Sequence, residues 1–336
     1  MKEALFYERE QDGQVRCGLC RFHCLIGEGK RGNCAVRENR GGTLYSLVYG
    51  KLCAWQIDPI EKKPLFHVLP GSRSYSIATV GCNFHCRHCQ NYSISQVPRN
   101  APVQGIDISP QEVVQQAVTG NCRSIAYTYT EPTVFYEFAY DTARLAREAG
   151  LKNIFVTNGY ISKEALTMIA PYLDAANIDL KGFSEGFYRD VVHAQLSEVL
   201  DSIIEYRRLG IWIELTTLII PGLNDDGEEL QRLASFIVTN LGVDTPWHVS
   251  QFYPTYQLTD RPRTPVETLR RARDIGLAAG LRYVYEGNVP GEGGENTSCP
   301  SCESLLIRRY GYTIESNRLS NGICPDCGTR IAGIGM

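Results

Sequence analysis

Residues 74–91 read SYSIATVGCNFHCRHCQN, and this stretch decides the fold. Its first part, residues 75–80, is a short apolar run of the kind that forms a buried strand. Gly81 follows, and then come Cys82, Cys86 and Cys89 with the spacing CxxxCxxC. In barrels of parallel strands the reactive groups lie at the carboxyl ends of the strands. We therefore expect a metal-binding loop directly after the first strand of such a sheet.

Short apolar runs alternate with helical stretches along the chain, which is typical of a parallel α/β sheet. Helices are predicted at residues 109–120, with Ser109 as N-cap and Pro110 in the first helical position, and at residues 134–150, closed by Gly150. No phosphate-binding glycine fingerprint is present, which favours a partial barrel over a dinucleotide-binding sheet. The predicted fold class is α/β, a partial (β/α)6 TIM-like barrel, with strands at residues 75–80, 124–129, 153–157, 175–179, 212–218 and 248–252.

The 336 residues are expected to form three modules. A Cys-rich module with a lead-in spans residues 1–72, the barrel spans residues 73–288, and a second Cys-rich module spans residues 289–336. The formal net charge of −3 gives no overall attraction to nucleic acid or to an anionic membrane. No apolar run approaches the roughly 20 residues that span a bilayer, and the start MKEALFYERE lacks a signal-peptide pattern, so we expect a cytoplasmic protein without membrane contact.

The 13 cysteines exceed what packing requires, and clustered cysteines in a reducing compartment bind metals more often than they form disulfides. Cys53 and Cys122 stand apart and are expected to be small buried residues. The remaining cysteines form an N-terminal, a central and a C-terminal set: Cys17, Cys20, Cys24 and Cys34; Cys82, Cys86 and Cys89; and Cys299, Cys302, Cys324 and Cys327.

The central set offers three thiolates within one loop. Three thiolates hold three irons of a 4Fe-4S cluster and leave the fourth iron open, and an open position on a metal is where a substrate binds. The alternative is an incomplete zinc site, which would need His85 or His88 as a fourth ligand.

The C-terminal set consists of two CxxC pairs around a strand-rich stretch at residues 305–314, which predicts a zinc ribbon. Four thiolates complete the coordination of zinc, so this ion is expected to serve folding. The N-terminal set has a less diagnostic spacing. Zinc is the first expectation there, which gives two zinc ions in all, and a second iron-sulfur cluster for electron delivery or substrate binding is the alternative.

With these motifs the chain resembles the radical S-adenosylmethionine (SAM) superfamily. The resemblance implies that the open iron of the cluster on Cys82, Cys86 and Cys89 binds SAM and that a reductant such as flavodoxin or ferredoxin supplies an electron. A 5′-deoxyadenosyl radical then reacts with an unidentified small molecule or macromolecule. His88 stands where the family has an aromatic residue facing the adenine, and it is carried over as a cofactor-binding residue.

The ends of later strands carry further residues that the resemblance assigns to the cofactor. Glu131, in TYTEP, is expected to accept hydrogen bonds from the SAM ammonium, or else to be an acidic residue at a helix N-terminus. Asn158, in TNG, suits the ribose or the carboxylate. Asp179 and Lys181, in DLK, are expected to bind SAM or a substrate, or to pair with each other. The segments TNG and DLK resemble glycyl-radical (pyruvate formate-lyase) activating enzymes.

Five segments are together similar to the radical SAM component of the AmmeMemoRadiSam system. This resemblance implies an association with AMMECR1-like and Memo-like proteins and leaves the substrate open. Lys62 and Lys63 either meet an anionic substrate or are solvated. The segments are CGLCRFHCLIGEGKRGNC from residue 17, DPIEKKPLFHVLPG from residue 58, CNFHCRHCQN from residue 82, YTYTEPT from residue 127 and GNVPGEGGENTSCPSC from residue 287.

Two other functions remain open. The first is an activase that installs a glycyl radical on a partner protein, which the segments TNG and DLK favour. The second is an iron-sulfur and zinc adaptor without catalysis, which the zinc ribbon alone would permit. An adaptor has no need of polar groups at successive strand ends, so the barrel favours an enzyme. His248, on the sixth strand, is expected to be a hydrogen-bonded core residue.

Overall fold

The computed structural model describes residues 1–336, which form two units that both combine separate parts of the chain. Unit 1 comprises Met1–Asp58, Arg73–Ala176 and Ser197–Ile211. Unit 2 comprises Pro59–Ser72, Asn177–Leu196 and Trp212–Met336. The division falls within strand β13 (Ala175–Asp179). The three modules expected from the sequence stay a prediction.

The larger sheet of unit 1 is built from parallel strands. β11 (Ser124–Tyr127) pairs in parallel with β9 (Arg73–Ala78) and with β12 (Lys152–Thr157). β8 (Ala54–Pro59) lies beside β9, which gives the order β12-β11-β9-β8. All four residues of β11 are buried, as expected of a strand that is covered on both faces. The alternating sequence pattern therefore predicts this part of the fold correctly.

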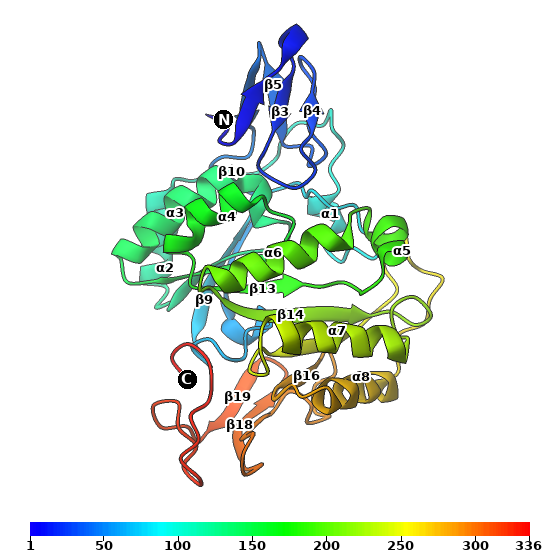
Figure 1. Cartoon of the computed structure of the whole chain (residues 1–336). Helices are drawn as coiled ribbons and strands as arrows, with labels where there is room; N and C mark the ends of the chain where they lie inside the picture. Colours follow the sequence, from blue (N-terminus) through cyan, green and yellow to red (C-terminus); the bar gives the residue numbers. More distant parts are fainter. The chain divides into compact units, whose positions relative to one another are not determined.

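Helices cover this sheet, and their termini follow local sequence signals (Figure 1). α2 (Pro110–Thr119) packs against α3 (Tyr136–Glu148) and contacts β9 and β11. Ser109 and Glu112 form a reciprocal capping box at the start of α2, as the N-cap prediction requires. α3 is preceded by a 3-10 helix, η3 (Pro132–Phe135). The other helices of unit 1 are α1 (Tyr92–Ser95), α4 (Lys163–Ile169) with the 3-10 turn η4 (Ala170–Tyr172), and α6 (Leu196–Arg208).

The N-terminal residues of unit 1 form small antiparallel sheets. A buried ion pair fixes them to α3, because Nη1 of Arg37 lies 2.9 Å and 3.0 Å from the two carboxylate oxygens of Glu137. The strands are β1 (Lys2–Glu3), β6 (Thr43–Ser46) and β5 (Arg37–Arg40) in one sheet, β2 (Tyr7–Arg9), β3 (Val15–Cys17) and β4 (Leu25–Ile26) in a second, and β7 (Lys51–Leu52) with β10 (Ile106–Asp107) in a third; η1 (Gln11–Gly13) is a 3-10 turn.

Unit 2 contains a second set of parallel strands. β15 (Trp247–Gln251) pairs in parallel with β14 (Trp212–Ile219) and β16 (Val284–Gly287). α7 (Gly227–Asn240) packs against α8 (Val266–Ala278), and α8 contacts β15 and β16. The shorter elements are the 3-10 turn η2 (Ile60–Lys62), the helical turn α5 (Glu185–Phe187) with the π-helix η5 (Tyr188–Val192), and the antiparallel strands β17 (Thr297–Ser298), β18 (Leu305–Tyr310) and β19 (Thr313–Asn317).

A buried carboxylate in unit 2 holds the lead-in segment against the strands. Glu214 on β14 is fully buried and accepts the backbone N–H groups of Phe66 at 2.9 Å and His67 at 2.8 Å. Nε2 of His248 lies 2.7 Å from the same carboxylate, which confirms His248 as a hydrogen-bonded core residue. Lys63 is also buried, at 1 % exposure, so the alternative of a solvated lysine is wrong for Lys63.

Most of the predicted strands are present, with shifted ends. β13 has the predicted bounds, whereas β9 lies two residues before its prediction because Thr79 and Val80 are buried loop residues and not strand residues. β8 and β16 were not predicted, and they extend the strand set beyond the six expected. No helix combines the length and the apolar character that crossing a membrane requires.

Candidate functional site

The central cysteines lie in the loop that follows β9, as predicted. Cys82 and Cys86 are 7 % and 6 % exposed, and Cys89 is half-buried. The loop starts at Gly81, whose φ of +94° is one that glycine adopts freely. A Cβ at Gly81 would also stand 2.8 Å from the backbone oxygen of Cys34, so a side chain has no room here. Position 81 therefore requires glycine for two reasons, its backbone conformation and the lack of room for a side chain.

Hydrogen bonds between groups other than the thiols help to hold the loop in shape. The N–H of Gly81 donates to the oxygen of Ile94 at 2.9 Å. The side chain of Gln96 donates to the oxygen of Phe84 at 3.1 Å, and its Oε1 lies 2.7 Å from Nδ1 of His85. These contacts place His85 in a polar pair with Gln96, which does not favour His85 as the fourth ligand of a zinc site. The sulfur of Cys89 in addition lies 3.1 Å from the hydroxyl of Ser95.

The surroundings of Cys82 suit a thiolate that is bound to a metal. Burial raises the pKa of the Cys82 thiol well above its usual value, and the negative charges of Glu131, Cys86 and Cys89 raise it further. The N–H of Phe84 points at its sulfur from 3.4 Å. A group of thiolates in such a place needs bound cations to stay ionised, and metal binding supplies them. The residues present therefore fit a cluster held by Cys82, Cys86 and Cys89.

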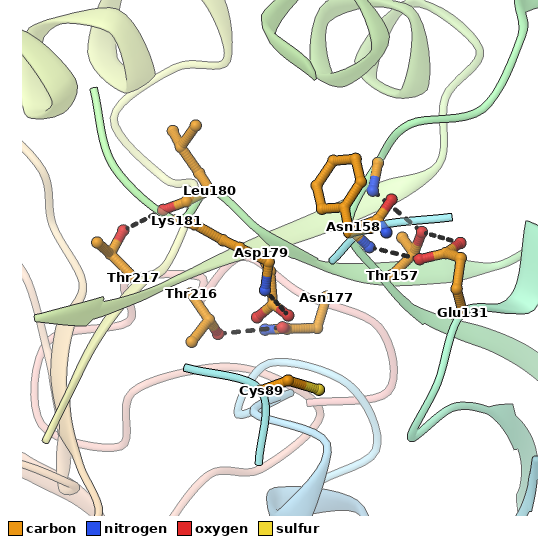
Figure 2. Close-up of polar contacts among 12 residues, drawn as sticks. Cys89, Glu131, Thr157, Asn158, Asn177, Asp179, Leu180, Lys181, Thr216 and Thr217 are labelled. Carbon is orange, nitrogen blue, oxygen red and sulfur yellow. Dashed lines mark hydrogen bonds and ion pairs between the residues drawn. The ribbon is translucent and has the colours of Figure 1, made fainter. Parts of the chain in front are cut away.

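Glu131 is a fully buried carboxylate that joins two strand ends of unit 1 (Figure 2). Its Oε1 accepts hydrogen bonds from Thr157 Oγ1 at 2.7 Å and from the N–H and hydroxyl of Thr133 at 3.0 Å and 2.6 Å. Its Oε2 accepts the N–H of Asn158 at 2.8 Å. Glu131 is also the N-cap of η3. This is the alternative given in the sequence analysis, an acidic residue at a helix N-terminus. These contacts are those of a positioning residue, and SAM binding by Glu131 stays a prediction.

Asn158 follows β12 and reaches the cysteine loop. Its Nδ2 donates to Oδ1 of Asn83 at 2.8 Å and lies 3.8 Å from the sulfur of Cys82. Its Oδ1 accepts the N–H of Tyr160 at 2.9 Å. The structure therefore brings together Cys82, Glu131 and Asn158 from three consecutive strand ends of unit 1.

Asn83 is the site residue that sequence reasoning missed. It is fully buried inside the CxxxCxxC loop, accepts from Asn158, and donates through Nδ2 to the oxygen of Tyr160 at 3.3 Å. A polar amide between two cysteines of a buried loop was the available signal. This signal did not identify Asn158 as the partner of Asn83, because the two residues lie 75 positions apart in the sequence.

The other residues assigned to the cofactor are less informative. His88 is buried at 4 % exposure, and its role stays a prediction. In unit 2, Nζ of Lys181 lies 3.0 Å from Oδ2 of Asp179, which is the mutual ion pair that the sequence left open (Figure 2). Neighbouring strands there are also tied by Thr216, whose hydroxyl donates to Asn177 at 3.0 Å (Figure 2). Their roles toward SAM or a substrate stay predictions.

The C-terminal cysteines form a compact metal-type site in unit 2. The sulfurs of Cys299, Cys302, Cys324 and Cys327 all lie within 4.8 Å of one another. Hydrogen bonding by Thr329 lowers the pKa of the Cys327 thiol to about 6, which favours a thiolate at neutral pH. Of the two cysteines outside the sets, Cys122 is buried as expected, whereas Cys53 is half-buried.

Comparison with known proteins agrees with this geometry. Residues 76–237 match the model of the Radical SAM superfamily, and the chain belongs to this superfamily, whose members are generally enzymes and use SAM. The uncharacterized protein MJ0808 of Methanocaldococcus jannaschii is 49% identical over 333 residues, which cover 98% of this chain and 99% of that protein.

Two more distant likenesses are informative about class and fold. The 4-hydroxyphenylacetate decarboxylase activating enzyme of Clostridium scatologenes is 22% identical over 172 residues, which cover 46% of this chain and 53% of that enzyme. A radical SAM methyltransferase from Sphaerobacter thermophilus superposes with a TM-score of 0.53 at 16% identity and covers 70% of this chain and 71% of that chain. The second likeness shows the fold alone.

Proposed function

We propose that the chain binds a 4Fe-4S cluster through Cys82, Cys86 and Cys89 and cleaves SAM reductively for radical chemistry on an unidentified substrate. When bound, the cluster supplies the electron that turns SAM into methionine and a 5′-deoxyadenosyl radical. The observation that carries the proposal is the buried loop after β9, which presents three thiols and to which Asn158 is hydrogen-bonded. Flavodoxin or ferredoxin is the class of reductant that fits this activity.

The protein's own groups position the reaction. Glu131 holds the backbone N–H of Asn158, and Asn158 holds the side chain of Asn83 within the cysteine loop. Changes at Glu131 are therefore transmitted to the loop through two hydrogen bonds. Cys82 and Cys86 are buried, and a cluster held by them would be shielded from water on their side, which would limit side reactions of a radical formed there.

Anaerobic reconstitution with iron and sulfide tests the proposal. After addition of SAM and dithionite, the protein is expected to release 5′-deoxyadenosine, and Cys86→Ala is expected to abolish the release together with about four irons per chain. Cys122→Ala is the matched control, because this buried cysteine belongs to no set, and it should keep both iron and activity. A cluster-loaded protein that neither binds nor cleaves SAM would disprove the proposal.

A narrower assignment rests on the sequence segments. Their similarity to the radical SAM component of the AmmeMemoRadiSam system supports a protein that acts with AMMECR1-like and Memo-like partners in the cytoplasm. A pull-down from cells with the full chain as bait tests this, and enrichment of neither partner class would contradict it. We further propose zinc at the C-terminal cysteines, supported by the close approach of their sulfurs.

The second candidate function is activation of a glycyl-radical enzyme. It is favoured by the likeness to the 4-hydroxyphenylacetate decarboxylase activating enzyme. An activase produces a glycyl radical on its partner protein, which has a characteristic electron paramagnetic resonance (EPR) signal. Incubation of the active protein with candidate partner proteins would separate this function from chemistry on a small molecule.

A further inference from the structure

The four N-terminal cysteines of unit 1 converge on one cavity. Cys17, Cys20, Cys24 and Cys34 all line it together with Arg37. Local backbone pairing brings them together, because the N–H of Cys17 at the end of β3 donates to the oxygen of Cys24 at 2.9 Å. The backbone of Cys20 forms an isolated antiparallel β-bridge with that of Ile161. The cavity is therefore a feature of the folded N-terminal sheets and not of one flexible loop.

The sulfurs around this cavity are arranged differently from those of a zinc site. Four sulfurs on one zinc ion stand about 3.8 Å apart, because Zn–S bonds of about 2.3 Å point to the corners of a tetrahedron. The C-terminal set has this spacing, with sulfur–sulfur distances of 3.5 Å for Cys299 and Cys327 and 3.7 Å for Cys302 and Cys324. It is the only cysteine set whose sulfurs all lie within 4.8 Å of one another. Thiolates that bind separate irons of a cluster must stand farther apart.

Charges around the cavity also suit a metal cluster. The buried guanidinium of Arg37 interacts electrostatically with Cys17 and Cys34. The N–H of Asn33 points at the sulfur of Cys24 from 3.5 Å. Positive charge and N–H groups near thiolate sulfurs stabilise the reduced form of an iron-sulfur cluster.

The cavity adjoins the loop of the central cysteines. The backbone oxygen of Cys34 packs against Gly81, the residue before Cys82. On the other side, Nδ2 of Asn33 donates to the backbone oxygen of Asn83 at 2.8 Å. The residues that neighbour the two cysteine sets in sequence are therefore in direct contact with each other. Few covalent and hydrogen-bonded links separate the two sets, which favours electron transfer between them.

We propose that Cys17, Cys20, Cys24 and Cys34 bind a second 4Fe-4S cluster that relays single electrons to the site of Cys82, Cys86 and Cys89. The relay rests on the proposed function. One electron from a ferredoxin or flavodoxin reduces the second cluster from its 2+ to its 1+ state. The same electron then reduces the site at Cys82, Cys86 and Cys89, and the second cluster returns to 2+. No bond is broken and no proton moves in this step.

A triple variant of the full chain tests the metal at the N-terminal set. Cys82→Ala, Cys86→Ala and Cys89→Ala together remove the central site and leave the N-terminal cysteines unchanged. After reconstitution this variant is expected to keep about four irons and four sulfides per chain, with an EPR signal on reduction that SAM does not alter. Adding Cys17→Ala and Cys34→Ala should remove that iron. A triple variant with no iron and two zinc ions would overturn the proposal.

The relay is tested by comparing two reductants on wild type and a Cys17→Ala/Cys34→Ala variant. Dithionite is small and can reach the central site directly, whereas a carrier protein depends on the relay. The ratio of flavodoxin-driven to dithionite-driven SAM cleavage is expected to fall at least tenfold in the variant, and an unchanged ratio overturns the relay.

If the Cys17→Ala/Cys34→Ala variant does not fold, EPR of the wild type tests the relay instead. Two reduced clusters that lie near each other broaden each other's EPR signals, and the signal of only one cluster would contradict the relay. If the wild type cleaves no SAM with either reductant, the proposed function fails. The iron content of the triple variant then still decides whether the second cluster exists.

Discussion

The side-chain amide of Asn33 donates a hydrogen bond of 2.8 Å to the backbone oxygen of Asn83, and it thereby joins the N-terminal sheets to the cysteine loop after β9. Oδ1 of Asn33 lies 3.2 Å from Nε2 of His85 and 3.2 Å from Nη2 of Arg99. One amide thus contacts the loop at two points. This contact makes the order of the loop depend on the N-terminal residues.

Asn33→Ala is expected to loosen the cysteine loop without unfolding the protein. The variant loses two contacts to the loop, each worth about 1 kcal/mol, so iron should be lost to a chelator about thirtyfold faster. The measurement is the rate of iron release under anaerobic conditions. Asn240→Ala, at an exposed helix end with a hydrogen bond only within α7, is the matched control. Equal release rates in the two variants would argue against the role of Asn33.

Glu131→Gln is expected to lower both stability and SAM affinity. The amide group would place an N–H₂ donor against the N–H of Asn158 or the donors of Thr133, and all of these atoms are buried. A donor left unsatisfied in this way costs about 2 kcal/mol. Urea unfolding and calorimetric SAM binding measure the two effects. Glu164→Gln, at an exposed position of α4, should leave both within about 0.5 kcal/mol of wild type.

Acid is expected to destabilise unit 2 through His67. Burial lowers the pKa of His67 from 6.5 to about 4, so the folded protein keeps this ring neutral while the unfolded chain takes up a proton. Stability is therefore full above pH 6.5 and decreases as the pH falls toward 4. The expected loss from this group between pH 7 and pH 5 is about 2 kcal/mol.

The pH dependence of urea unfolding measures this loss. His67→Gln should have a shallower pH dependence than wild type, since Gln does not titrate. His193→Asn is the control, because His193 is exposed and has a φ of 62° that Asn tolerates. If His193→Asn made the pH dependence of unfolding as shallow as His67→Gln does, the loss of stability in acid would not come from His67.

Cys302→Ala is expected to remove one zinc ion per chain and to lower the melting temperature. Cys302 is exposed, so the loss cannot come from a cavity in the core. The small sheet of β17, β18 and β19 is short, so a metal held by its cysteines is expected to contribute to its stability. Metal analysis and calorimetry of Cys302→Ala and Cys53→Ala would compare a ligand with a cysteine outside the sets. Unchanged zinc in Cys302→Ala would contradict the zinc site.

The sequence allowed the parallel strands and the cysteine loop to be predicted because both depend on local patterns. An apolar run with flanking turns specifies β13, and CxxxCxxC specifies the spacing of ligands. The same patterns misplaced the end of β9, because Val80 is as buried in a loop as it would be in a strand. β16 was missed because VYEG is short and places Glu286 among buried residues.

The contacts that shape the site depend on distant pairs and were not predictable in this way. Glu131 finds its partners on two strand ends, and Asn83 finds Asn158 across 75 positions. Composition and spacing also could not show that Cys17, Cys20, Cys24 and Cys34 surround a cavity. These features follow from how the strands of unit 1 are placed, which no single segment encodes.

The tight contact between Gly81 and the oxygen of Cys34 has a practical consequence for handling the protein in air. The N-terminal residues form one wall around the start of the cysteine loop, and Val36 completes it. A chain shortened to begin at residue 73 would open this wall to dissolved oxygen, which degrades exposed iron-sulfur clusters. A cluster held by this loop is therefore expected to be more sensitive to air in a chain that lacks Cys34 and Val36.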